Sequence, residues 1–136
     1  MKRYWIPVLT VASIACFSVI PLEAHHSFAA QYDRTKSITL EGEVTNVEWM
    51  NPHVYFYIDV ADANGAITNW AIELGAPNGL RRRGWGKDTL KMGDAVEIDG
   101  WLSKDGAPTA NASSVIGPDG NPLFAGTSNP DEAERD

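Results

Sequence analysis

The chain has a single cysteine, Cys16, among its 136 residues. This cysteine lies in the apolar run Trp5–Ile20, which follows Lys2 and Arg3 near the start of the chain. A basic start, an apolar run and a small residue at the exit are typical of a secretory signal peptide. Cleavage after Ala24 removes the cysteine, so the mature chain cannot form a disulfide, even in an oxidising compartment.

The sequence also lacks an apolar segment long enough to span a membrane. A spanning helix needs about 20 apolar residues, whereas the run Trp5–Ile20 is shorter and contains Pro7. We therefore expect export with cleavage and no membrane attachment afterwards. The expected location is periplasmic or secreted.

Basic residues are few. The chain has 11 Lys and Arg against 18 Asp and Glu, with a net charge of −7. A surface of this sign repels phosphate backbones, so nucleic acid is excluded as a general partner. The basic cluster Arg81–Arg83 is typical of a solvated helical turn.

Sequence signatures of enzymes are missing. No serine lies in a nucleophile elbow, no glycine-rich phosphate loop follows an expected strand, and no His-Glu-x-x-His motif occurs. Acidic residues such as Asp59 and Glu73 fall on strand positions where exposed carboxylates are common. We expect a binding protein and no catalysis.

Apolar and polar residues alternate with a period of two along the middle of the chain, as in half-buried strands. The alternation in Ile38–Val44 changes phase at Thr45-Asn46, which indicates a β-bulge. Asp62–Gly65 and Lys91–Asp94 are typical turns. The residues expected on inward strand faces are Val54, Phe56, Ile58, Trp70, Ile72, Val96 and Ile98.

The order of elements predicts an all-β fold. Three strands, a helical connection of one or two turns after Pro77, and two further strands fit a small five-stranded Greek-key barrel. This barrel is of the oligonucleotide/oligosaccharide-binding (OB) type; an immunoglobulin-like sandwich needs about seven strands. The expected organisation is a signal peptide (1–24), an N-terminal arm (25–37), the OB-like barrel domain (38–125) and a disordered acidic tail (126–136).

Several distinct short motifs lie along the mature part of the chain: His25-His26-Ser27-Phe28, Glu41-Gly42-Glu43-Val44, Glu48-Trp49-Met50-Asn51-Pro52-His53-Val54, Trp70-Ala71-Ile72-Glu73 and Pro77-Asn78-Gly79-Leu80. Together they resemble a bacterial family of small secreted proteins whose domain has no assigned function. The resemblance spans roughly the whole mature chain. It implies a periplasmic β-rich domain with an export signal, and it implies no activity.

The three histidines of the chain suggest a metal site. Cleavage after Ala24 makes His25 the N-terminal residue, and its α-amine and ring nitrogen form a chelate that favours Cu(II) or Ni(II). His26 and His53 offer further imidazole ligands, and Met50 offers a weak thioether. The sequence therefore predicts that His25, His26 and His53 hold copper or another transition metal.

This site requires the N-terminal arm to fold back onto the domain. Ordering an arm costs about 1–2 kcal/mol per residue, so apolar anchors are needed. We expect Phe28 to pack on the barrel, with Tyr32 as a second anchor, and to hold His25 and His26 near His53.

Two alternatives stay open. Asn-Pro is a turn initiator, so in the first alternative Asn51-Pro52-His53 does no more than bend one strand into the next. His53 then hydrogen-bonds Glu48 or a backbone carbonyl. Tyr55 and Tyr57 alternate onto an outer strand face, where they and Trp49 can bind a flat ligand or a protein segment. The sequence thus indicates an exported binding protein with a copper site, or a metal-free module for a small ligand or a periplasmic protein.

Overall fold

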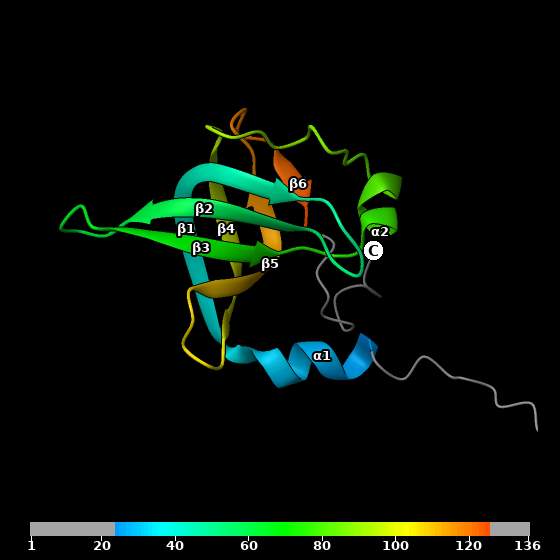
Figure 1. The fold of residues 1–136 in the computed structure, drawn as a ribbon, viewed down its shortest axis with the longest axis horizontal. Helices are drawn as coiled ribbons and strands as arrows, with labels where there is room; N and C mark the ends of the chain where they lie inside the picture. The colour runs from blue at the N-terminus through cyan, green and yellow to red at the C-terminus, as the bar shows by residue number, and fades with distance from the viewer. Residues whose placement is uncertain (1–23, 126–136) are drawn as a thin grey trace, which may run out of the picture.

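The computed structural model describes residues 24–125, and it shows a mostly β fold. The predicted acidic tail and, apart from Ala24, the predicted signal peptide lie outside the described residues. Figure 1 shows the elements, which in chain order are α1 (Ala24–Gln31), β1 (Tyr32–Glu48), β2 (Tyr55–Ala61), β3 (Ile67–Glu73), α2 (Pro77–Arg82), β4 (Ala95–Ser103), β5 (Thr109–Ile116) and β6 (Pro122–Phe124).

The strands of this region form one sheet in the order β3-β2-β1-β4-β5-β6, with antiparallel neighbours. In addition, β3 pairs with β5 in parallel over Ala71–Glu73. The 17-residue strand β1 pairs with β4 along its earlier part and with β2 along its later part. Figure 1 shows β1 bending along its length, with β2 and β3 passing in front of β4. The sheet is therefore strongly curved.

Two local features account for the bend in β1. The register with β2 shifts between Val44 and Asn46, which confirms the predicted bulge. Near the same point, a Cβ atom on Gly42 would lie 2.5 Å from the carbonyl oxygen of Asp59. Only glycine permits so close an approach of the two strands.

The core confirms the period-two alternation. Phe56, Ile58, Ile72 and Ile98 are fully buried. Val54 and Val96 are also buried, whereas Trp70 is half-buried and packs against the edge of the same cluster. The predicted hairpin turn is present as well, with the Asp62 carboxylate accepting hydrogen bonds from two backbone amides of the turn. The helical connection after Pro77 is α2.

Three details differ from the sequence prediction. The described sheet has six strands, because the segment around Leu123 pairs with β5 as β6. The first strand begins at Tyr32, although residues 32–37 show no alternation, because Tyr32 pairs with Ser103 and its ring is buried. The expected N-terminal arm (25–37) consists of α1 and the start of β1.

Candidate functional site

A buried carboxylate, that of Glu73 at the end of β3, is the centre of a polar cluster. Its side chain accepts hydrogen bonds at Oε2 from the hydroxyl of Tyr32 (2.5 Å) and from the hydroxyl of Tyr55 (2.7 Å). Its Oε1 lies 2.8 Å from Nδ1 of His53. Glu73 is only 3% exposed, and a buried carboxylate is stable only when it is paired. Donors from three separate segments satisfy it here.

Backbone pairing brings these segments together. Tyr55 of β2 lies directly opposite Glu73 in the β2–β3 register, so the two side chains share one face of the sheet. The connection between β1 and β2 is tied to the end of β3 by hydrogen bonds from Val54 N to Gly75 O and from Leu74 N to Val54 O. This fixes His53, the residue before Val54, beside the carboxylate.

The protonation states of the cluster suit these bonds. Burial raises the pKa of the Glu73 carboxyl, but the hydrogen bonds from His53, Tyr32 and Tyr55 outweigh burial and hold that pKa below its usual range. Burial and the neighbouring carboxylate raise the pKa of the Tyr32 and Tyr55 hydroxyls. The carboxylate therefore stays ionised while both tyrosines stay protonated donors.

The helix α1 is anchored next to this cluster. Phe28 is 1% exposed, and its ring centroid lies 5.4 Å from that of Tyr32 and 5.5 Å from that of Trp101, edge-on to the latter. The guanidinium of Arg34 lies over the Phe28 ring at 5.3 Å. Such contacts each add about 0.5–1.5 kcal/mol beyond burial. The expectation that Phe28 packs on the domain is confirmed.

The other candidate residues have different surroundings. Tyr57 is half-buried and donates a hydrogen bond to Glu48 (3.1 Å). The guanidinium of Arg81 lies 5.7 Å from the centroid of the Trp49 ring. The structure therefore brings together His53 and Tyr55, whereas Tyr57 and Trp49 make separate contacts.

His25 and His26 lie in the first turns of α1, but their side chains fall outside what the structure describes. The prediction that they meet His53 thus stays a prediction. Among the side chains that are described, no group of three or more His, Cys, Asp or Glu residues could hold a metal ion.

Two members of the cluster, Glu73 and Tyr32, were not predicted as site residues. Glu73 alternates onto the outer face of β3, where a carboxylate is normally exposed, and Tyr32 lies 41 residues away in the chain. Period-two alternation identifies strand faces but gives no signal that side chains from distant segments bury a residue on the outer face. The alternative interpretation of His53 named Glu48 or a backbone carbonyl as its partner, whereas Nδ1 of His53 contacts Glu73.

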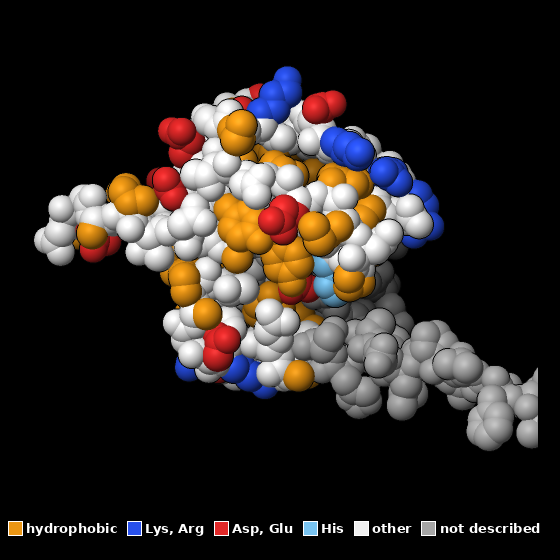
Figure 2. Space-filling view, in the orientation of Figure 1, with side chains coloured by type: hydrophobic (Ala, Val, Ile, Leu, Met, Phe, Trp, Pro, Cys, Tyr) orange, Lys and Arg blue, Asp and Glu red, His pale blue; other side chains and the backbone are white. Residues whose placement is uncertain are grey.

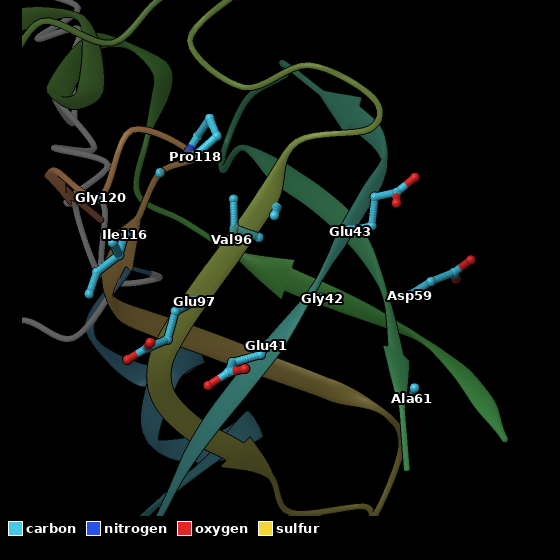
Figure 3. Close-up of a pocket in the computed structure, with 12 residues that line it drawn as sticks. Glu41, Gly42, Glu43, Asp59, Ala61, Val96, Glu97, Ile116, Pro118 and Gly120 are labelled. Atoms are coloured by element: carbon cyan, nitrogen blue, oxygen red, sulfur yellow. The ribbon is translucent and has the colours of Figure 1, made fainter. Parts of the chain in front are cut away.

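An open hollow of about 710 Å³ lies elsewhere on the sheet, over β1, β2 and β4. Its acidic lining residues are Glu41, Glu43, Asp59 and Glu97. Figure 3 shows the carboxylates of Glu41 and Glu97 on one side and those of Glu43 and Asp59 pointing away from them. The four groups do not converge on one point, so this hollow is no cation site.

The surface shows two further features. Figure 2 shows hydrophobic side chains gathered at the centre of the face over β2 and β3, and basic side chains along the edge near α2. Arg81, Arg82 and Arg83 are all exposed there, as a solvated helical turn predicts. Over residues 24–125, neither helix has the length and apolar character needed to cross a bilayer.

Comparison with known protein families places the chain in one of them. A family of unknown function, DUF6152, matches residues 11–112, which include the helix α1, the connection that carries His53, and Glu73. No curated protein matches the chain significantly. Since the match covers well over half of the sequence, the chain belongs to the family of unknown function DUF6152.

Proposed function

We propose that this protein is exported to the periplasm and binds a transition metal ion, Cu(II) in the first instance, through His25, His26 and His53. The observation that carries the proposal is the contact of His53 Nδ1 with the buried carboxylate of Glu73 at 2.8 Å. Histidines that ligate metals commonly donate their second ring N–H to a carboxylate. In a metal-ligating histidine such a bond places a proton on the nitrogen next to the carboxylate, so that the other ring nitrogen binds the metal.

The anchoring of α1 supports a contribution from the N-terminal histidines. Phe28 and Tyr32 hold the helix against the sheet, which removes the entropic obstacle to ordering the arm. In the view of Figure 1, the first turn of α1 and the connection between β1 and β2 lie at the same side of the molecule. The donor set is rich in nitrogen and has no thiolate after cleavage, which suits Cu(II) better than Cu(I).

We also propose that the sheet is an OB-like Greek-key barrel. The pairings β1–β2, β2–β3, β3–β5, β5–β4 and β4–β1 support it, because they form a continuous ring of five strands. The helix α2 lies in the connection between β3 and β4. In such a barrel the connection between β1 and β2, which carries His53, lies at a rim where ligands bind.

The proposal requires His25 to be the first residue of the mature protein. We expect the exported protein, measured by intact mass, to lack the first 24 residues and to begin at His25. A mature chain that retains Trp5, or that begins beyond His25, would remove the chelate formed by the α-amine and the ring.

Replacing His53 with alanine should weaken Cu(II) binding to the mature protein at least tenfold. About 1.4 kcal/mol, the equivalent of tenfold, is the least that the loss of a real ligand should cost. Competition against a chelator of known affinity measures the change. The matched control is the same mature chain acetylated at its α-amine, which keeps all three rings and removes the amine as a ligand. Equal affinity of wild type and His53→Ala would contradict a role for His53.

A second candidate rests on the apolar face over β2 and β3 in Figure 2. Here the protein would bind a flat small ligand or a protein segment through Tyr57 and Trp49, without a metal. Tyr55 supports it less, because its hydroxyl is engaged by Glu73. Binding of a partner that is lost in Tyr57→Ala and kept in His53→Ala would favour this candidate over the metal site.

A further inference from the structure

Tyr32 connects two parts of the molecule that the sequence separates. It is the first residue of β1, immediately after α1, and its ring packs against Phe28 of that helix. Its hydroxyl donates to Oε2 of Glu73, while Oε1 of the same carboxylate contacts His53. The Glu73 carboxylate thus lies between Tyr32, which packs on α1, and the imidazole of His53.

The end of α1 is held at the same place by the connection between β4 and β5. The ammonium group of Lys104 donates to the carbonyl of Ala29 (2.5 Å), and the Lys104 backbone N–H donates to the carbonyl of Gln31 (2.9 Å). The helix therefore docks through its second half, and Tyr32 follows directly after these contacts. A docked helix fixes where the Tyr32 hydroxyl lies.

We propose that Tyr32 and Glu73 are positioning residues for His53, and that through them the docking of α1 orients the imidazole for metal binding. This inference rests on the proposed function, because it assigns the way in which the proposed metal site is assembled. Docking and ligand orientation are then coupled, and coupling of this kind is reciprocal. Whatever stabilises the bond between His53 and Glu73 also stabilises the docked helix.

The structure offers a matched pair of variants for the test. Tyr32→Phe and Tyr55→Phe each remove one hydroxyl that donates to the same Oε2 atom, and each keeps the ring. Tyr55 is the first residue of β2 and is held by pairing with β1 on one side and β3 on the other. Only Tyr32 adjoins the helix, so only its hydroxyl links the carboxylate to α1.

The first measurement is amide hydrogen exchange at residues 28–31 in the metal-free mature protein. These amides belong to the second half of α1, where helical hydrogen bonds form. We expect exchange to be at least about fivefold faster in Tyr32→Phe and also faster in His53→Ala, because couplings of this type amount to 5–150-fold. Tyr55→Phe should exchange in α1 as the wild type does. Adding Cu(II) to the wild type should slow exchange there.

The second measurement is Cu(II) affinity. Tyr32→Phe should weaken binding by about fivefold or more, and it should have no further effect when His53 is already alanine. Unchanged α1 exchange in Tyr32→Phe, or equal effects of Tyr32→Phe and Tyr55→Phe, would overturn the inference. Failure of the proposed function looks different, since Cu(II) affinity would then be the same in wild type and His53→Ala while the exchange pattern persists.

Discussion

Replacing Phe56 with alanine is expected to lower the free energy of unfolding by about 3–5 kcal/mol, the range for truncating a buried aromatic side chain. Phe56 is fully buried in β2 and lies within the main core cluster. A domain of this size has a total stability of about 5–15 kcal/mol, so the variant should be largely unfolded at moderate urea concentrations. Urea denaturation followed by circular dichroism measures the change.

The matched control is Ile67→Ala on the adjacent strand. Ile67 is 59% exposed, so its truncation should change stability by no more than about 0.5 kcal/mol. Comparable losses in the two variants would show that the inward and outward strand faces are misassigned.

Replacing Glu73 with alanine is expected to lower the free energy of unfolding by about 2–4 kcal/mol. The substitution leaves the hydroxyls of Tyr32 and Tyr55 without their acceptor, and each buried donor left unsatisfied costs about 1–3 kcal/mol. Glu48→Ala is the matched control, because Glu48 also accepts a tyrosine hydroxyl but lies in a less buried position. A loss no larger than that of Glu48→Ala would contradict a structural role for the cluster.

The effect of Glu73 also has a predicted dependence on pH. The folded pKa of this carboxyl lies below its usual value, so ionised Glu73 stabilises the folded state. That contribution is fully present above the unfolded pKa of about 4.3 and is lost as pH falls towards the folded pKa. The difference in stability between wild type and Glu73→Ala should therefore be largest near neutral pH and shrink in acid.

The strand faces could be predicted from the sequence because side-chain alternation is a local property. Leu40, Phe56 and Ile98 each lie on the inward face that the period of two assigns to them. The bulge at Thr45-Asn46 could be predicted for the same reason, since it reverses the alternation. The turn at Asp62–Gly65 followed from its residue types.

The helix α1 and the burial of Glu73 could not be predicted, because both depend on contacts between distant segments. The residues before Ile38 show no alternation. They are held on the domain because Phe28 packs on Trp101 and Tyr32. Glu73 occupies an outer strand position that is normally solvated, and it is buried by side chains from β1, β2 and their connection. The sequence identified His53 as a candidate and missed the carboxylate that holds it.

The metal site itself is tested most directly by the electron paramagnetic resonance spectrum of the mature protein with one equivalent of Cu(II). The reference is a synthetic peptide of residues 25–31, which has the α-amine and the imidazoles of His25 and His26 but lacks His53. We predict a type-2 spectrum with nitrogen hyperfine structure that differs from that of the peptide and reverts towards it in His53→Ala. A protein spectrum that superimposes on that of the peptide would show a generic chain-terminus chelate and contradict the proposed site.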